Sequence, residues 1–141
     1  MIDKADFYHG AALVRVIEDA RCESIARREL GYLVNGRAAV CVKYSTKARS
    51  PWQFTLTADE VDNCGSAAAE GRQCVVAFVC GGDGICAVPW HEVNGLIAGK
   101  AGAGISAKRA FNGCYSLTGP NGPLKRKVAR NQWPGILFSE D

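Results

Sequence analysis

The sequence lacks the features that mark several large classes of protein. It contains no apolar run near the ~20 residues that a membrane-spanning helix needs. Its first ten residues have mixed charge and no apolar core of a secretion signal, so we expect a cytoplasmic protein. With 48% hydrophobic and 22% charged residues, the composition is that of a globular protein and excludes a disordered or collagen-like chain.

The cysteines and histidines are not spaced for a metal site. None of the seven cysteines forms a Cys-x-x-Cys pair, and His9 and His91 are the only histidines. Structural zinc sites usually bring ligands in closely spaced pairs, so we expect no metal and no cofactor. Most cysteines lie in apolar runs, which predicts reduced thiols that pack as small hydrophobic residues. The alternative is a Cys80 thiolate activated by one of the histidines.

A helix and a hairpin are predicted in the first part of the chain. Apolar residues at helical spacing, among them Val16 and Ile17, indicate an amphipathic helix over residues 10–21, which continues or restarts over 24–29. The Asn35-Gly36 pair then lies between two β-prone runs, which is the preferred sequence of a type I′ hairpin turn.

A second helix and a buried hairpin are predicted next. Thr57 and Glu60 have the spacing of a capping box, which begins a helix that runs to about Ala69. Residues 74–80 form a continuous apolar run, as expected for a central strand, and an antiparallel strand follows at 85–88. Pro89 can open a third helix. Short strands follow at 105–108, 114–117 and 124–128, with a turn at 111–113.

This order of elements predicts the fold class. The chain has 141 residues, with no internal repeat and no linker, so we expect a single α+β domain that spans residues 1–141. Its sheet should be mixed and mostly antiparallel, with two to three helices packed on it.

The positive charge is concentrated in the last third of the chain. The formal net charge is +3, and the basic excess lies in residues 100–141, where Lys125, Arg126 and Lys127 are consecutive. A basic patch attracts polyanions, including nucleic acid or an acidic protein face. The alternative is a solvated surface that maintains solubility.

Residues 43–54 form the best candidate for a surface site. Basic Lys43, Lys47 and Arg49 alternate there with aromatic residues, of which Trp52 is the largest. Basic groups interleaved with aromatic rings suit phosphate contacts combined with base stacking. The alternative places the aromatic residues in the core and leaves Lys47 and Arg49 as solvated loop charges.

The order helix, antiparallel strand pair, helix, buried strand resembles the core of the PD-(D/E)XK nucleases. The resemblance implies a Mg²⁺ site in which carboxylates hold the metal and Lys43 orients the attacking water. The sequence departs from that motif, because Cys41 stands where an Asp or Glu is required and no acid occurs in residues 31–52. The acids that neighbouring elements could supply are Glu18, Asp19, Glu29, Asp59 and Glu60.

Three further blocks resemble a family of small uncharacterised bacterial proteins. They are the HG-x-x-L helix within FYHGAAL, the KYS-x-K…SPW-x-F segment, and the VCG-x-DGI turn, which together cover about residues 7–90. The resemblance implies a shared fold and brings no established activity.

The sequence therefore predicts a binding or accessory protein, more readily than a self-sufficient enzyme, that engages a polyanionic partner. Nucleic acid is the first choice of partner. A protein complex that handles nucleic acid is the second, which would suit an accessory or inhibitory factor derived from a phage or mobile element. The alternative is a metal-dependent nuclease that uses Lys43 with displaced carboxylates and Mg²⁺.

Overall fold

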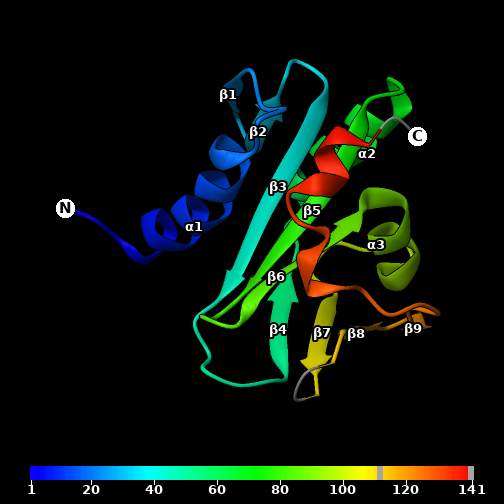
Figure 1. Ribbon diagram of the computed structural model, residues 1–141. Helices are drawn as coiled ribbons and strands as arrows, with labels where there is room; N and C mark the ends of the chain where they lie inside the picture. The colour runs from blue at the N-terminus through cyan, green and yellow to red at the C-terminus, as the bar shows by residue number, and fades with distance from the viewer. Residues whose placement is uncertain (111–112, 140–141) are drawn as a thin grey trace.

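The computed structural model describes residues 1–110 and 113–139, which form three α-helices and two β-sheets (Figure 1). The helices are α1 (Lys4–Glu18), α2 (Ala58–Ala69) and α3 (Trp90–Ile97), and two 3₁₀ turns follow near the C-terminus, η1 (Arg130–Gln132) and η2 (Gly135–Phe138). The strands are β1 (Ile25–Arg28), β2 (Gly31–Val34), β3 (Ala38–Ser45), β4 (Trp52–Thr55), β5 (Gln73–Cys80), β6 (Gly84–Pro89), β7 (Gly104–Arg109), β8 (Tyr115–Gly119) and β9 (Gly122–Pro123).

The larger sheet is mixed, as the sequence predicts. Its strand order is β1-β2-β3-β5-β6, in which β3 and β5 are parallel and the other neighbours are antiparallel. The helix α2 belongs to the crossover between the two parallel strands. A second, antiparallel sheet has the order β4-β7-β8-β9. The predicted α+β class, with a mostly antiparallel sheet, is confirmed, although the division into two sheets is not apparent from the sequence.

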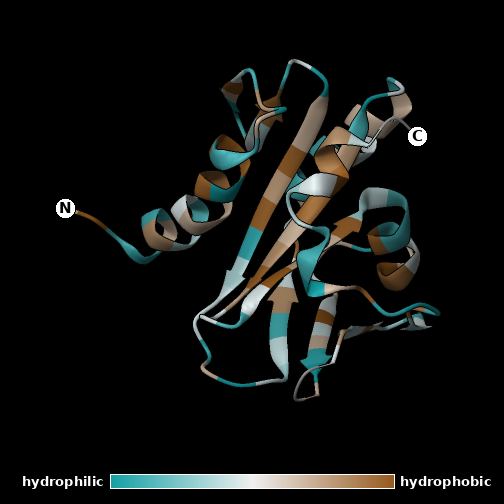
Figure 2. Ribbon diagram, viewed as in Figure 1, coloured by the Kyte–Doolittle hydropathy of each residue, from teal (hydrophilic) through white to brown (hydrophobic). Residues whose placement is uncertain are grey.

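The central strand β5 is covered on both faces. Side chains alternate along a strand, so Val75, Ala77 and Val79 pack under α1 and the C-terminal turns. Val76 and Phe78 point the other way, into a core shared with α2, α3 and the second sheet. Figure 2 shows the apolar character of β3 and β5 at the centre of the molecule. None of the helices in the described residues combines the length and apolar character required to cross a bilayer.

Three local predictions are wrong. The first helix begins at Lys4, because the Asp3 side chain caps it in a reciprocal box with Asp6. Residues 24–29 form no helix, since 25–28 pair with β2 as an edge strand. Residues 124–128 form no continuous strand, because only Val128 makes a bridge, to Tyr115. Part of the turn expected at 111–113 lies outside the described residues.

Because β2 is shorter than β3, part of β3 has an unpaired edge beside the candidate site. Their register runs from Val34↔Ala38 to Tyr32↔Val40 and ends there. The strand β3 continues to Ser45, and β5 pairs with it along that whole length. Within the described residues, the last part of β3 therefore has a neighbouring strand on one side only.

Candidate functional site

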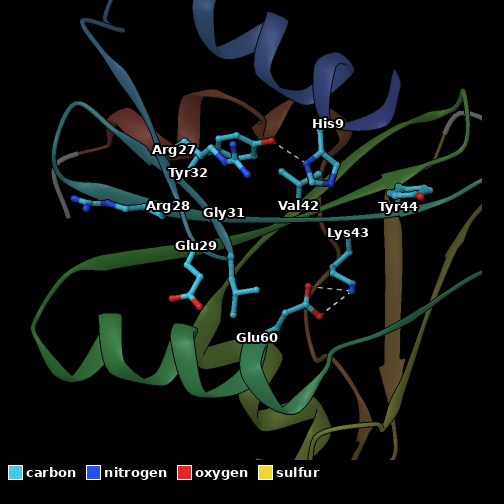
Figure 3. Close-up of a pocket in the computed structure, with 11 residues that line it drawn as sticks. His9, Arg27, Arg28, Glu29, Gly31, Tyr32, Val42, Lys43, Tyr44 and Glu60 are labelled. Atoms are coloured by element: carbon cyan, nitrogen blue, oxygen red, sulfur yellow. Dashed lines mark hydrogen bonds and ion pairs between the residues drawn. The ribbon is translucent and has the colours of Figure 1, made fainter. Parts of the chain in front are cut away.

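A cavity of about 610 Å³ lies beside this unpaired edge of β3 (Figure 3). Four separate parts of the chain supply its walls: α1, the β1–β2 hairpin, the end of β3, and the first turn of α2. The polar and aromatic residues that line it are His9, Arg27, Arg28, Glu29, Tyr32, Lys43, Tyr44 and Glu60.

Lys43 and Glu60 form an ion pair at the α2 side of the cavity. Lys43 lies on the face of β3 that points to α2, and its Nζ is 2.8 Å and 3.1 Å from the two carboxylate oxygens of Glu60. Glu60 is also the last residue of the predicted capping box, at the third position of α2, and it accepts a hydrogen bond from the Thr57 backbone N–H. Burial acts to raise the pKa of Glu60, but the hydrogen bonds from Lys43 and Thr57 outweigh it and hold the pKa below its ordinary value.

His9 lies at the opposite, α1 side of the cavity. Its Nδ1 is 2.9 Å from the hydroxyl of Tyr32, and its ring meets the rings of Tyr32 and Tyr44 edge-on. Burial lowers the pKa of His9 below 6.5, and the negative charge of Asp6 only partly opposes this effect. The neutral form of the imidazole is therefore favoured at pH 7, and this form can both donate and accept hydrogen bonds.

Aromatic and cationic side chains complete the walls. Tyr44 is stacked on Tyr8 with ring centroids 4.9 Å apart, which fixes the plane of the ring at the cavity margin. Arg27 and Arg28 are exposed on β1, the edge strand. Because Lys43 neutralises Glu60, the two arginines and Glu29 supply the remaining formal charge of the lining.

The predicted binding residues of the segment 43–54 are only partly brought together. Lys43 lines the cavity, and Lys47 and Arg49 are exposed on the loop that follows β3. Trp52 is only 2% exposed, and its indole N–H donates to the Lys47 carbonyl. The expectation that Trp52 stacks on bases is therefore wrong, because its ring is part of the core; the same holds for Phe54.

The basic residues of the last third do not reach this cavity. Arg126 is paired with Glu92 of α3, with an Nη2–Oε1 distance of 2.6 Å, and that pairing raises its pKa. Lys127 donates to the hydroxyl of Ser116 on β8, and Lys125 is exposed. These residues lie beside α3 and the second sheet, so they form a separate basic surface.

The acids do not gather as the nuclease resemblance requires. No group of three His, Cys, Asp or Glu side chains suited to a metal ion occurs within residues 1–110 and 113–139. Of the five acids considered from the sequence, Glu29 and Glu60 line the cavity, and Glu60 is occupied by Lys43. The residues present therefore fit poorly with a Mg²⁺ site.

The alternative of a reactive Cys80 is also wrong. Its thiol is fully buried, and burial raises its pKa to about 12, whereas an activated nucleophile needs a lowered pKa. All seven cysteines are free, and five of them are buried.

Three cavity residues escaped sequence reasoning, namely Arg27, Arg28 and Tyr32, and His9 was considered only as a possible partner of Cys80. The expected helix began after His9, and the arginines lay in the segment 24–29 that could have continued that helix. The Asn35-Gly36 turn could have indicated Tyr32, because the turn fixes the register of the hairpin. In that register Val34 pairs with Ala38 and Tyr32 pairs with Val40, next to the point where the unpaired edge of β3 begins.

Comparison of the chain with protein-family models, with curated protein sequences and with solved structures gives no match. The resemblances to the bacterial family and to the nuclease core therefore stay predictions.

Proposed function

We propose that this protein binds a single-stranded nucleic acid through the cavity beside the end of β3. The observation that carries the proposal is the convergence of Arg27, Arg28, Lys43 and the tyrosines Tyr32 and Tyr44 on one cavity from separate elements. The two exposed arginine forks suit phosphate oxygens, Lys43 stays paired with Glu60 beside them, and a tyrosine ring offers a surface on which a base can stack.

The size of the cavity favours an unpaired strand over a duplex. Ligand pockets typically enclose about 300–1,000 Å³, and this cavity of about 610 Å³ can accept a base with its sugar and phosphate. Only an unpaired base can leave its neighbours and stack on a ring inside a cavity. The separate surface of Lys125 and Lys127 is available to strands long enough to extend beyond the cavity.

Fluorescence anisotropy with short labelled single-stranded RNA and DNA tests this proposal. The double variant Arg27→Ala, Arg28→Ala removes both guanidinium groups that line the cavity and should weaken binding at least tenfold. Tyr44→Leu should weaken single-strand binding by roughly fivefold or more, since stacking contributes about 1–3 kcal/mol per base. Lys100→Ala, an exposed cation in the loop after α3, is the matched control and should leave affinity unchanged.

Two outcomes would overturn the proposal. One is an absence of binding at low salt to either nucleic acid, which would leave an acidic protein surface as the better partner. The other is an Arg27→Ala, Arg28→Ala variant that binds as tightly as the unmodified protein.

A second candidate function is phosphodiester cleavage of the PD-(D/E)XK kind. Glu60 is one of the acids that the displaced-carboxylate hypothesis requires and it lies beside Lys43, but their ion pair leaves Glu29 as the one unpaired acid among the described residues of the cavity lining, so this candidate ranks below the binding function. Incubation of plasmid and single-stranded DNA with Mg²⁺ or Mn²⁺ separates the two candidates. Cleavage that Lys43→Ala and Glu60→Gln abolish supports the nuclease, whereas binding without cleavage supports the binding protein.

A further inference from the structure

The outer face of α1 is apolar and exposed. Phe7, Val14 and Ile17 are 65%, 51% and 66% exposed, whereas Ala12 and Val16 on the opposite side of the helix are fully buried. All the large hydrophobic residues that are exposed in the described part of the chain fall within its first 17 residues. The sequence pattern had placed Ile17 in the core, and the structure places it in solvent.

The spacing of this face is that of a helix-pairing seam. Phe7, Gly10, Val14 and Ile17 are separated by steps of three, four and three residues, the alternation by which one helix packs along another. Gly10 and its neighbour Ala11 lie midway along the seam. Their small side chains allow a second helix backbone to approach closely at that point. We call Phe7, Gly10, Val14 and Ile17 the α1 seam.

The charges beside the seam are self-complementary. Lys4 stands at the N-terminal end of α1 and Glu18 at its C-terminal end, both exposed and both flanking the seam. In an antiparallel pair of identical helices centred on Ala11, Lys4 of each chain faces Glu18 of the other. Glu18 also lies 3.8 Å from Arg15 of its own helix, and both side chains are mostly solvated, so this contact competes weakly.

We propose that the α1 seam binds the α1 seam of a second copy of this chain, antiparallel and about a two-fold axis at Ala11. Such an interface is isologous, because the same patch serves both partners. The proposal is independent of the nucleic-acid cavity, since His9 points from the other side of α1 and stays accessible in the pair. The dimer would therefore carry two open cavities.

The charge of α1 distinguishes this partner from a lipid surface. Helices that lie on membranes are rich in Lys and Arg on their polar face. In α1, Lys4 and Arg15 are balanced by Asp6 and Glu18. The helix therefore has no basic face for anionic lipid, whereas its opposite charges at the two ends match an inverted copy of itself.

Sedimentation velocity over a range of concentrations tests the pairing. The full chain should shift from the mass of one chain, 15.1 kDa, toward twice that mass as concentration rises. Val14→Asp and Ile17→Asp each place a carboxylate in the seam and should keep the protein monomeric. Ala20→Asp, exposed just after the helix, is the control and should dimerise normally. Circular dichroism checks that every variant is folded.

Charge-swap variants and a cysteine cross-link test the antiparallel register. Lys4→Glu and Glu18→Lys should each weaken the dimer, and the double swap should restore it, which a parallel pair would not show. In a Cys114→Ser background, Ala11→Cys should form a disulfide-linked dimer on mild oxidation. The proposal is overturned if the protein is monomeric at every concentration, or if Val14→Asp leaves the dimer intact. It is also overturned if the protein binds vesicles of phosphatidylcholine and phosphatidylserine while it stays monomeric.

Discussion

At the scale of single residues, His9 contributes to the pH dependence of the free energy of unfolding, because its ring is partly buried beside Tyr32. The unfolded chain binds the proton with a pKa near 6.5, and burial lowers the pKa in the folded chain, with Asp6, Lys43, Asp3 and Glu60 making smaller contributions. Below pH 6.5 the unfolded state therefore binds more protons, and the free energy of unfolding falls as the pH is lowered.

We expect urea denaturation to show this loss between about pH 7.5 and pH 5, above the range in which carboxylates titrate. His9→Asn removes the titrating group and should flatten the profile in that window. An unchanged slope in His9→Asn would contradict the assignment of the effect to His9.

Phe78 is the residue for which sequence and structure agree most directly. It lies in the middle of the apolar run at 74–80, and its side chain is fully buried against Phe54, with ring centroids 4.7 Å apart. Phe78→Ala should destabilise the fold by about 3–5 kcal/mol, because it removes a buried ring and leaves a cavity. A loss below about 1 kcal/mol in a urea titration would mean that the core can collapse around the missing ring.

At the scale of elements, the turn between β5 and β6 joins the two sheets. The Asp83 carboxylate accepts hydrogen bonds from Arg109 of β7 and from the hydroxyl of Tyr115 of β8, at 2.6 Å and 2.8 Å. These bonds hold the pKa of Asp83 below its ordinary value. Gly81 sits in the same turn with φ +54°, where a Cβ would overlap the Lys47 carbonyl.

Asp83→Asn should lower the free energy of unfolding by about 1–3 kcal/mol, since it removes the charge that Arg109 and Tyr115 are oriented to meet. The matched control is Asp62→Asn, an exposed position on α2, whose effect should stay within about 0.5 kcal/mol. Thermal and urea denaturation of both variants provide the measurement. Equal losses in the two variants would show that Asp83 does not couple the sheets.

The elements that the sequence predicts well are those with a local cause. The Thr57–Glu60 capping box defines where α2 begins, and the Asn35-Gly36 turn defines the β2–β3 hairpin. Partners distant in sequence are not encoded locally. Nothing near Asp83 indicates Arg109, and nothing near Lys43 specifies which of five acids it contacts. Ile17 is a further example. Its helical spacing is that of a core residue, but the spacing does not determine which side of α1 the sheet covers, and the sheet covers the opposite side.

At the scale of the whole molecule, the positive charges occur on two surfaces that a salt titration can separate. Arg27 and Arg28 border the cavity, Lys47 and Arg49 lie on the loop after β3, and the C-terminal basic residues lie beside the second sheet. Each phosphate that a protein cation neutralises on a single strand contributes about 0.7 to the slope of log K against log salt. Arg27, Arg28, Lys47 and Arg49 together therefore give a slope near about −3 for an oligonucleotide that reaches the loop after β3 as well as the cavity but is too short to reach the second sheet.

Arg27→Ala, Arg28→Ala should reduce that slope to about half, and should do so equally for different sequences, because phosphate contacts position a strand without reading its bases. Charge reversal at Lys125 and Lys127 should leave the slope for a short strand unchanged and lower it only for longer strands. Anisotropy titrations at several salt concentrations, with short and long strands, measure both effects. A slope that responds only to Lys125 and Lys127 would contradict binding at the cavity and move the nucleic-acid surface to the second sheet.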